Sequence, residues 1–342
     1  MLQAPITGVA LSATLRTIAE DIGILACVRN FVVLRYQVSM IARRSRIHRT
    51  RTGKRIEITS RDIEIFRALA RYRYLRSTYL YAFAGGASET RFKERLGDLF
   101  HEGFIDRPGP QWRFAHARHM PVVYEIGAHA KRILAEYAGG EEPARTFLSE
   151  AVHRQFAHSV MICECLASIE IATREVRGLR FIPWPEILAR APESTRDSAI
   201  PFRIGVSSGA IIPDGLFGLE YQSEGKKTYR FFALEVDRST MPVERSNRNQ
   251  TSYLAKLGMY RQIIVGHVHK AHLGISTLFV LTVTTQETRL AEIARGFERG
   301  GRGPEFLFKS VAEQSLIKPI PRLLGEPWQR AGVPPLNIAE SD

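Results

Sequence analysis

The sequence predicts a protein of the α+β or α/β class with two domains. Residues 60–137 read as three short helices, short strands and a fourth helix. Residues 149–313 read as a long helix, two strands, a helix, a third strand, another helix and a late strand. The stretch AGGEEPAR at 138–145 breaks the periodicity between these two sets. With 342 residues, 44% apolar and 24% charged, the chain has the composition of a globular protein.

We divide the chain into a basic N-terminal segment, a first domain and a second domain, at residues 1–56, 57–140 and 145–335. Residues 43–55, RRSRIHRTRTGKR, carry seven basic residues and no acidic one, which suits a flexible arm that follows phosphates or enters a minor groove. A solvated linker is the alternative. A start at Met40 is also open, and residues 1–39 would then lie outside the true protein.

The formal charge of +13 is concentrated in the front of the chain. Residues 1–60 carry about +7, residues 61–140 about +4 and residues 141–342 about +2. Such an asymmetry indicates a polyanionic partner, here nucleic acid, although charge that serves only solubility is the alternative. No uncharged apolar run of about 18 residues is present, and no secretory signal is evident, so we expect a cytoplasmic protein.

The first domain has the element order of a winged helix. Ser60, Ser77 or Thr78, and Ser88 can cap three successive helices, and GFIDRPGPQWRF follows as two short strands around a Pro-Gly-Pro turn. In such a domain the third helix enters the major groove of duplex DNA. The DNA-binding positions would be Thr90, Arg91, Lys93 and Arg95 on that helix, with Arg107 and Arg113 on the wing. Glu89 and Glu94 dilute the basic face, so a protein partner is the alternative.

The second domain places carboxylates together at the ends of two strands. Glu235 and Asp237 are two residues apart and share one side of the strand FFALEVD. A turn centred on Glu224 and Gly225 would put Asp214 opposite Glu235. Oxygen ligands of this kind suit Mg²⁺ or Mn²⁺, so Asp214, Glu235 and Asp237 are predicted metal ligands. The structural alternative pairs the acids with Arg238, Arg245 or Arg248.

Pro213-Asp214, followed about twenty residues later by Glu235 on the next strand, resembles the PD-(D/E)XK nuclease core. The resemblance implies a restriction-endonuclease-like αβββαβ domain in which Asp214 and Glu235 bind a divalent metal that activates water against a phosphodiester. Asp237 stands where the core has a lysine. Lys256, on the following helix with Tyr253 and Tyr260 on the same face, is the candidate replacement, which makes Asp214, Glu235, Asp237 and Lys256 the predicted catalytic residues. Loss of catalysis with retention of the fold is the alternative.

The chain as a whole resembles the replication-relaxation family of plasmid and mobile-element proteins. The resemblance is spread over about residues 60–330, in segments such as RDIEIFRALARYRYL, HRQFAHSVMICECLASIEIA, ALEVDRSTMP and LAKLGMYRQI. It implies a winged-helix domain joined to a nuclease-like domain and a part in replication or mobilisation. Three hypotheses follow: a DNA-binding nickase, an inactive regulator of replication or transcription, and an adaptor that binds a relaxase or replication initiator. The oligomeric state is open.

Overall fold

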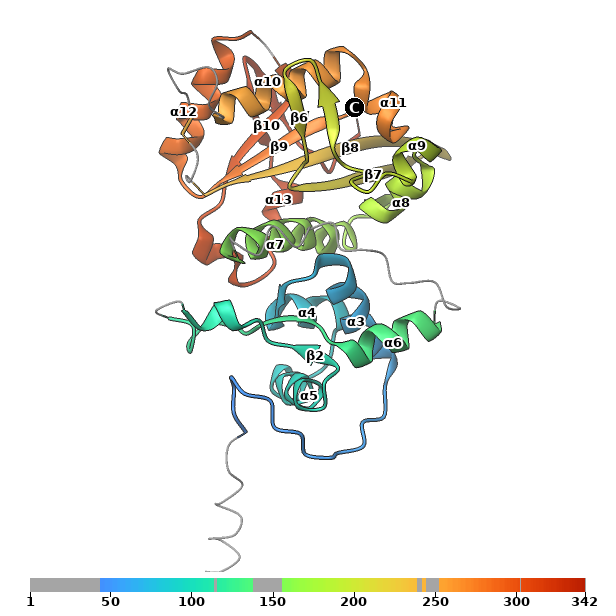
Figure 1. Ribbon diagram of the computed structural model, residues 1–342. Coiled ribbons are helices and arrows are strands. Elements are labelled where there is room, and N and C mark those ends of the chain that lie inside the picture. The colour runs from blue at the N-terminus through green and yellow to red at the C-terminus, as the bar shows by residue number, and fades with distance from the viewer. Residues whose placement is uncertain are drawn as a thin grey trace, which may run out of the picture. The chain divides into compact units, whose positions relative to one another are not determined.

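The computed structural model describes residues 44–113, 116–137, 156–238, 242–243, 252–301 and 303–341. The chain divides into two compact units, Met1–Thr50 and Arg51–Asp342. All helices and strands of the described chain belong to the second unit, which has mixed α and β structure, as the sequence predicts (Figure 1). The predicted boundary at 138–145 lies outside the described residues, and the division into two domains stays a prediction.

The N-terminal part of the second unit consists of four helices and a small antiparallel sheet. The helices are α3 (Ser60–Tyr72), α4 (Ser77–Ala84), α5 (Glu89–His101) and α6 (Ala128–Tyr137). The strands are β1 (Leu75–Arg76), β2 (Ile105–Asp106) and β3 (Val123–Ile126), in the order β1-β3-β2. Ser88 caps α5 as predicted, whereas α3 is capped by Thr59, which forms a capping box with the buried Asp62.

The partner of β2 is not the strand expected right after the Pro-Gly-Pro turn. Residues 109–113 form a 3₁₀ helix, η1 (Gly109–Arg113), and β2 pairs with β3 instead. The Gln111 side chain explains the difference, since it donates to the carbonyls of Pro108 and Val123 and accepts from the Val123 amide. These side-chain bonds replace ladder bonds that Pro108 and Pro110, without N–H groups, could not donate.

A seven-stranded sheet organises the rest of the unit, in the order β12-β11-β10-β9-β8-β7-β4. Its strands are β4 (Leu179–Pro183), β7 (Gly215–Ser223), β8 (Lys226–Asp237), β9 (Phe279–Thr284), β10 (Gly303–Ser310), β11 (Trp328–Ala331) and β12 (Val333–Leu336). Strands β8, β9 and β10 are parallel, and the other neighbours are antiparallel. Strands β4, β11 and β12 extend the sheet beyond the strands that the sequence predicted.

Helices cover both faces of this sheet (Figure 1). Helix α7 (Phe156–Thr173) packs on one face, against residues such as Phe217, Leu234 and Val283. Helices α10 (Tyr253–Val265) and α12 (Glu287–Glu298) pack on the other, against residues such as Ala233 and Val280. The smaller elements are α8 (Trp184–Arg190), α9 (Glu193–Arg196), β5 (Ile204–Val206), β6 (Gly209–Ile211), α11 (Val268–Leu273), η3 (Glu313–Ile317) and α13 (Arg322–Gly325).

The hairpin β7–β8 has the predicted turn and register. Gly215 pairs with Leu234 and Ser223 with Lys226, so the two-residue turn is Glu224-Gly225. Both turn residues have positive φ, 49° and 78°, as a type I′ turn requires. Strand β7 begins only at Gly215, because Pro213 cannot donate to a ladder, and the residues before the proline form the separate strand β6.

Helix α7 is buried on nearly all sides. By length and composition it could cross a membrane, but 83% of it is buried within the protein, as in a core helix. Its Glu164 and Glu170 are buried and each meets an arginine from the N-terminal part of the unit. Arg76 Nη1 lies 3.1 Å from Glu164 and Arg71 Nη1 lies 2.5 Å from Glu170. Buried carboxylates require such partners.

We expect the stability of the fold to depend on pH through Glu164. Burial raises the pKa of Glu164 from 4.5 to about 8, although Arg76 opposes the rise. The folded state therefore retains a proton that the unfolded state loses, and the contribution of Glu164 is fully present below 4.5 and lost as the pH rises through about 8. Relative to Glu164→Gln, the wild-type free energy of unfolding should fall by about 4 kcal/mol across this range.

Urea unfolding at several pH values would measure this difference. Glu175→Gln, at an exposed position just beyond the same helix, is the control and should follow the wild type at every pH. A constant difference between the wild type and Glu164→Gln from about pH 5 to about pH 8 would contradict the assignment.

Candidate functional site

The end of β8 carries two buried carboxylates on one side of the sheet. Glu235 is 0% exposed and Asp237 is 3% exposed. They alternate with Leu234 and Val236, which pack on the α7 side, so both carboxylates point toward α10 and α12. The sequence predicted this shared side correctly.

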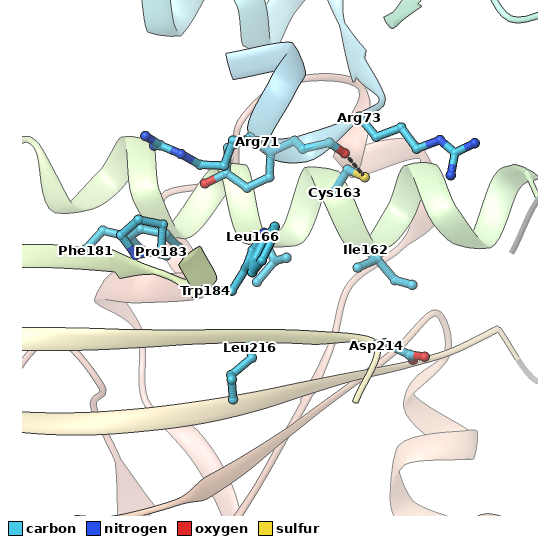
Figure 2. Close-up of a pocket in the computed structure, with 11 residues that line it drawn as sticks. Arg71, Arg73, Ile162, Cys163, Leu166, Phe181, Pro183, Trp184, Asp214 and Leu216 are labelled. Atoms are coloured by element: carbon cyan, nitrogen blue, oxygen red, sulfur yellow. Dashed lines mark hydrogen bonds between the residues drawn. The ribbon is translucent and has the colours of Figure 1, made fainter. Parts of the chain in front are cut away.

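Asp214 lies beside them, directly before the first residue of β7. Its Oδ2 atom accepts a hydrogen bond of 2.9 Å from the Val236 amide. Gly215 follows, and a Cβ at that position would come within 2.9 Å of Leu166, so α7 packs directly on the glycine. Figure 2 shows Asp214 at this strand end, below the part of α7 that carries Ile162 and Leu166.

Lys256 of α10 joins two of these carboxylates. Its Nζ atom donates to Glu235 Oε2 and lies 3.9 Å from Asp214 Oδ1. Tyr260, one turn later, donates to Glu235 Oε1, while Tyr253 donates to Thr282 Oγ1 at 3.2 Å. The structure therefore brings together Asp214, Glu235 and Lys256, the predicted acids and the predicted replacement lysine.

Asp237 has a separate partner. Arg289, in the first turns of α12, places its Nε atom 2.5 Å from Asp237 Oδ2. Arg238, one of the three arginines of the structural alternative, bonds instead to Glu313 at 3.1 Å. Arg245 and Arg248 lie outside the described residues. Sequence reasoning missed Arg289. A usable signal is its place at the start of α12, the helix that follows β9, which is the parallel neighbour of β8.

His158 is a second residue that sequence reasoning missed. It belongs to α7, and its Nε2 atom lies 3.6 Å from Asp214 Oδ2. Asp214 is thus approached by His158 from the α7 side and by Lys256 from the α10 side, because it stands at the end of a strand. Its segment, HRQFAHSV, is one of those that carry the family resemblance.

The charges of the site are strongly coupled. Burial opposes ionisation of Asp214, but Lys256, His158 and the Val236 amide outweigh it and hold the pKa of the carboxyl below its usual value. Burial raises the pKa of Glu235 to about 8, with Lys256 opposing the rise and Asp214 adding to it. Burial alone would lower the pKa of Lys256, but Asp214 and Glu235 raise it above its usual value. The site thus holds an ionised Asp214 beside a charged lysine.

The fit to a divalent metal rests on two carboxylates. Asp214 Oδ1 and Glu235 Oε2 both face the Lys256 ammonium, so they converge on one cation position. Asp237 is paired with Arg289. Within the described ranges, no group of three or more His, Cys, Asp or Glu residues could hold a metal ion. Mg²⁺ is commonly held by one or two carboxylates together with substrate phosphates, so a two-carboxylate site remains chemically suitable.

The cavity next to this site is small. It has a volume of about 20 Å³ and extends from Asp214 and Leu216 to Arg71 and Cys163 (Figure 2). That volume is close to the space of a single water molecule. A substrate would therefore have to approach Asp214 from outside rather than through this cavity.

The six predicted DNA-contacting residues divide into two groups. Thr90, Arg91 and Lys93 on α5, and Arg113 at the end of η1, are exposed. Lys93 also forms an ion pair of 2.8 Å with Glu89. Arg95 instead bonds to the buried Asp62 and to the Glu57 carbonyl, both at 2.6 Å.

Arg107 stacks over the Phe100 ring, with Cζ 4.0 Å from its centroid. Arg95 and Arg107 thus contact the folded chain, and we leave them out of the proposed DNA surface.

Residues 51–57 lie along α5. Thr52 donates from its amide and its hydroxyl to Glu102, at 2.9 and 2.6 Å, and Lys54 Nζ lies 2.6 Å from Asp98. Together with the bond from Arg95 to Glu57, these contacts run back along the helix from its C-terminal end. The end of the basic segment and the predicted recognition helix therefore form one continuous surface, on which Arg51 and Arg55 are exposed.

We expect Lys256 to be essential for the stability of the second part of the unit. Lys256→Met would leave Glu235 and Asp214 without their cation, which should lower the free energy of unfolding by about 3 kcal/mol in chemical denaturation. Adding Glu235→Gln should recover little of this loss, because the raised pKa of Glu235 keeps its carboxyl protonated near neutral pH and leaves Asp214 as the unpaired charge. Lys270→Met, at an exposed position on α11, is the control and should change little. Equal effects of the two lysine variants would contradict the pairing.

Comparison with known proteins agrees with the resemblance seen in the sequence. The model of the replication-relaxation family matches residues 66–278, more than half of the chain. No curated protein and no solved structure matches the chain. The matched range includes α5, the β7–β8 hairpin and Lys256. The chain therefore belongs to the replication-relaxation family.

Proposed function

We propose that this protein binds duplex DNA in the replication or mobilisation of a plasmid or mobile element, in the cytoplasm. Family membership supports a role in plasmid or mobile-element replication or relaxation. The observation that carries DNA binding is the surface that residues 51–57 form with α5, where Thr52 and Lys54 are bonded to Glu102 and Asp98. These bonds use Asp98 and Glu102 and leave Arg51, Arg55 and Arg91 exposed.

The order of elements supports a winged-helix reading of this part. Three helices are followed by a pair of strands, β2 and β3, with the long β2–β3 connection in the position of a wing. Helix α5 would then enter the major groove with Thr90, Arg91 and Lys93, and Arg113 would contact a flanking phosphate. Contacts of this kind between cations and phosphates dominate the affinity of DNA-binding proteins.

Charge-removing pairs of substitutions test the DNA surface. Arg91→Ala with Lys93→Ala, and separately Arg51→Ala with Arg55→Ala, should each weaken binding to duplex DNA by about 2–3 kcal/mol, and should lower the salt dependence of log K by about two. Fluorescence anisotropy with a labelled duplex at several salt concentrations measures both quantities.

Arg203→Ala with Lys270→Ala removes the same charge from exposed positions of the second part and is the matched control. If this control weakens binding as much as the other pairs, the effect is one of net charge and α5 is not the docking helix. If none of the pairs changes binding, a protein partner such as a relaxase or replication initiator becomes the better reading.

A second candidate function is metal-dependent nicking by the second part, favoured by the position of Lys256 against Asp214 and Glu235. A divalent cation held by Asp214 and Glu235, Mg²⁺ or Mn²⁺, would supply a Lewis acid for hydrolysis of a phosphodiester. Lys256 would stabilise negative charge on the phosphate. Asp237, a predicted metal ligand, would instead position Arg289. A fold of this kind without catalysis, acting as a regulator, is the alternative.

Conversion of supercoiled plasmid to nicked circles tests this activity. The wild type should nick the plasmid with Mg²⁺ or Mn²⁺, and a chelator should stop the nicking. Asp214→Asn should reduce the nicking rate by about 100-fold or more, because one of two metal ligands is lost. Calorimetric titration with Mn²⁺ should show binding that Asp214→Asn abolishes. If the protein binds metal without nicking DNA, the alternative of an inactive regulator is favoured. If the Asp214→Asn, Glu235→Gln double variant still nicks, the nicking activity does not belong to this site.

A further inference from the structure

An exposed isoleucine directly precedes the acidic site in the chain. Ile212 is 47% exposed and stands two residues before Asp214. Its neighbours Ile211 and Pro213 are both buried, and Ile211 belongs to the core between the sheet and α10. A large apolar side chain is therefore presented to solvent at the edge of the site.

Ile212 and Asp214 face the same side of the chain. The residue before a proline is restricted to an extended conformation, so Ile212 continues the direction of β6 up to Pro213. In an extended chain the side chains alternate, and residues two apart lie about 7 Å from each other on one side. The buried Pro213 between two partly exposed residues agrees with this alternation.

The polar side chains that reach solvent at the site are suited to a phosphate. Asp214, His158 and Lys256 have exposed side-chain fractions of 19%, 18% and 21%. The neighbouring cavity is too small for a substrate, so a phosphodiester would approach these groups from the outer side. Each phosphate of a nucleic acid carries a sugar and a base with it. Ile212, one side chain away from Asp214, is placed to contact that nucleoside.

An apolar side chain gains most from a base whose face is uncovered. In a stacked duplex the neighbouring bases cover both faces of each base, and the outer surface is the charged backbone. Where a step is unstacked, a base face becomes available, and isoleucine is among the side chains that proteins place against such steps. Contact with a base face also tolerates any sequence, because every base has such a face.

We propose that Ile212 packs against an unstacked base next to the phosphate that reaches Asp214. The second part then acts on DNA that is single-stranded or opened at this point, and the flanking paired DNA is left to the surface of α5 and residues 51–57. This inference rests on the proposed role of the acidic site in nicking, to which it adds the class of substrate.

Two labelled duplexes of equal length test the proposal, one fully paired and one with a short internal run of mismatches. Fluorescence anisotropy gives the affinity of the full chain for each, without divalent metal, so that no cleavage takes place. The wild type should bind the opened duplex about tenfold more tightly than the paired one, because only the opened duplex lets Ile212 bury its apolar surface against a base.

Substitutions at exposed isoleucines assign this preference. Ile212→Ser should bring the ratio of the two affinities close to one, whereas Ile212→Leu, which keeps the apolar surface, should retain it. Ile200→Ser is the matched control and should behave as the wild type, since Ile200 is 50% exposed on the connection between α9 and β5.

The proposal is overturned if the wild type binds the two duplexes equally or binds neither. It is also overturned if folded Ile212→Ser keeps the wild-type ratio, or if Ile200→Ser loses the ratio to the same extent. Because the ratio is measured without cleavage, a failure of nicking appears only in the plasmid assay, and the two failures are told apart.

Discussion

Glu235 and Asp237 lie on one side of β8, an interior strand of the sheet, where they are almost fully buried, so each must meet a partner from the helices on that side. Lys256 of α10 meets Glu235 and Arg289 of α12 meets Asp237. Breaking either pair would leave an uncompensated buried charge, which is among the costliest defects that a fold can contain. The two carboxylates therefore fix where α10 and α12 pack on the sheet.

The same constraint acts on the opposite face, through α7. Glu164 and Glu170 are buried in the middle of the unit, and both of their arginines come from the segment around α3 and β1. Apolar contacts are not directional, so these contacts alone would not fix the position of α3 and α4 along α7. The ion pairs, together with the hydrogen bond from Tyr72 to Glu170, define one alignment between the helices of the N-terminal part and the helix that covers the sheet.

The residues of the acidic site stabilise the fold, and they are also the residues that the proposed chemistry would use. Lys256 compensates Asp214 and Glu235 in the structure, and it is also the group that would stabilise charge on a phosphate. A cation that enters between the two carboxylates must share them with the lysine or displace it. Asp237, held by Arg289, stays outside that exchange. The site is an ion cluster in the structure, and the nicking that we propose would use the same residues.

Local rules determined the parts of this protein that depend on neighbouring residues. The two-residue turn at Glu224-Gly225 set the register of β7 and β8, strand alternation put Glu235 and Asp237 on one side, and Ser88 marked the start of α5. These features follow from backbone geometry over a few residues, so the sequence alone predicts them. Helical spacing in TSYLAKLGMYRQ likewise identified Lys256 as a candidate, although it could not give its distance from Asp214.

Only the tertiary structure decided which distant side chains meet. Arg289 and His158 approach the acids from helices whose packing depends on the whole sheet, and no local pattern specifies that contact. Arg95 is at an outward position of α5 by spacing, but the segment before α3 lies over it and turns it toward Asp62. The strand expected after Pro108 failed because a side chain, Gln111, took the ladder bonds. In each case the deciding interaction joins residues that the fold, rather than the sequence, makes neighbours.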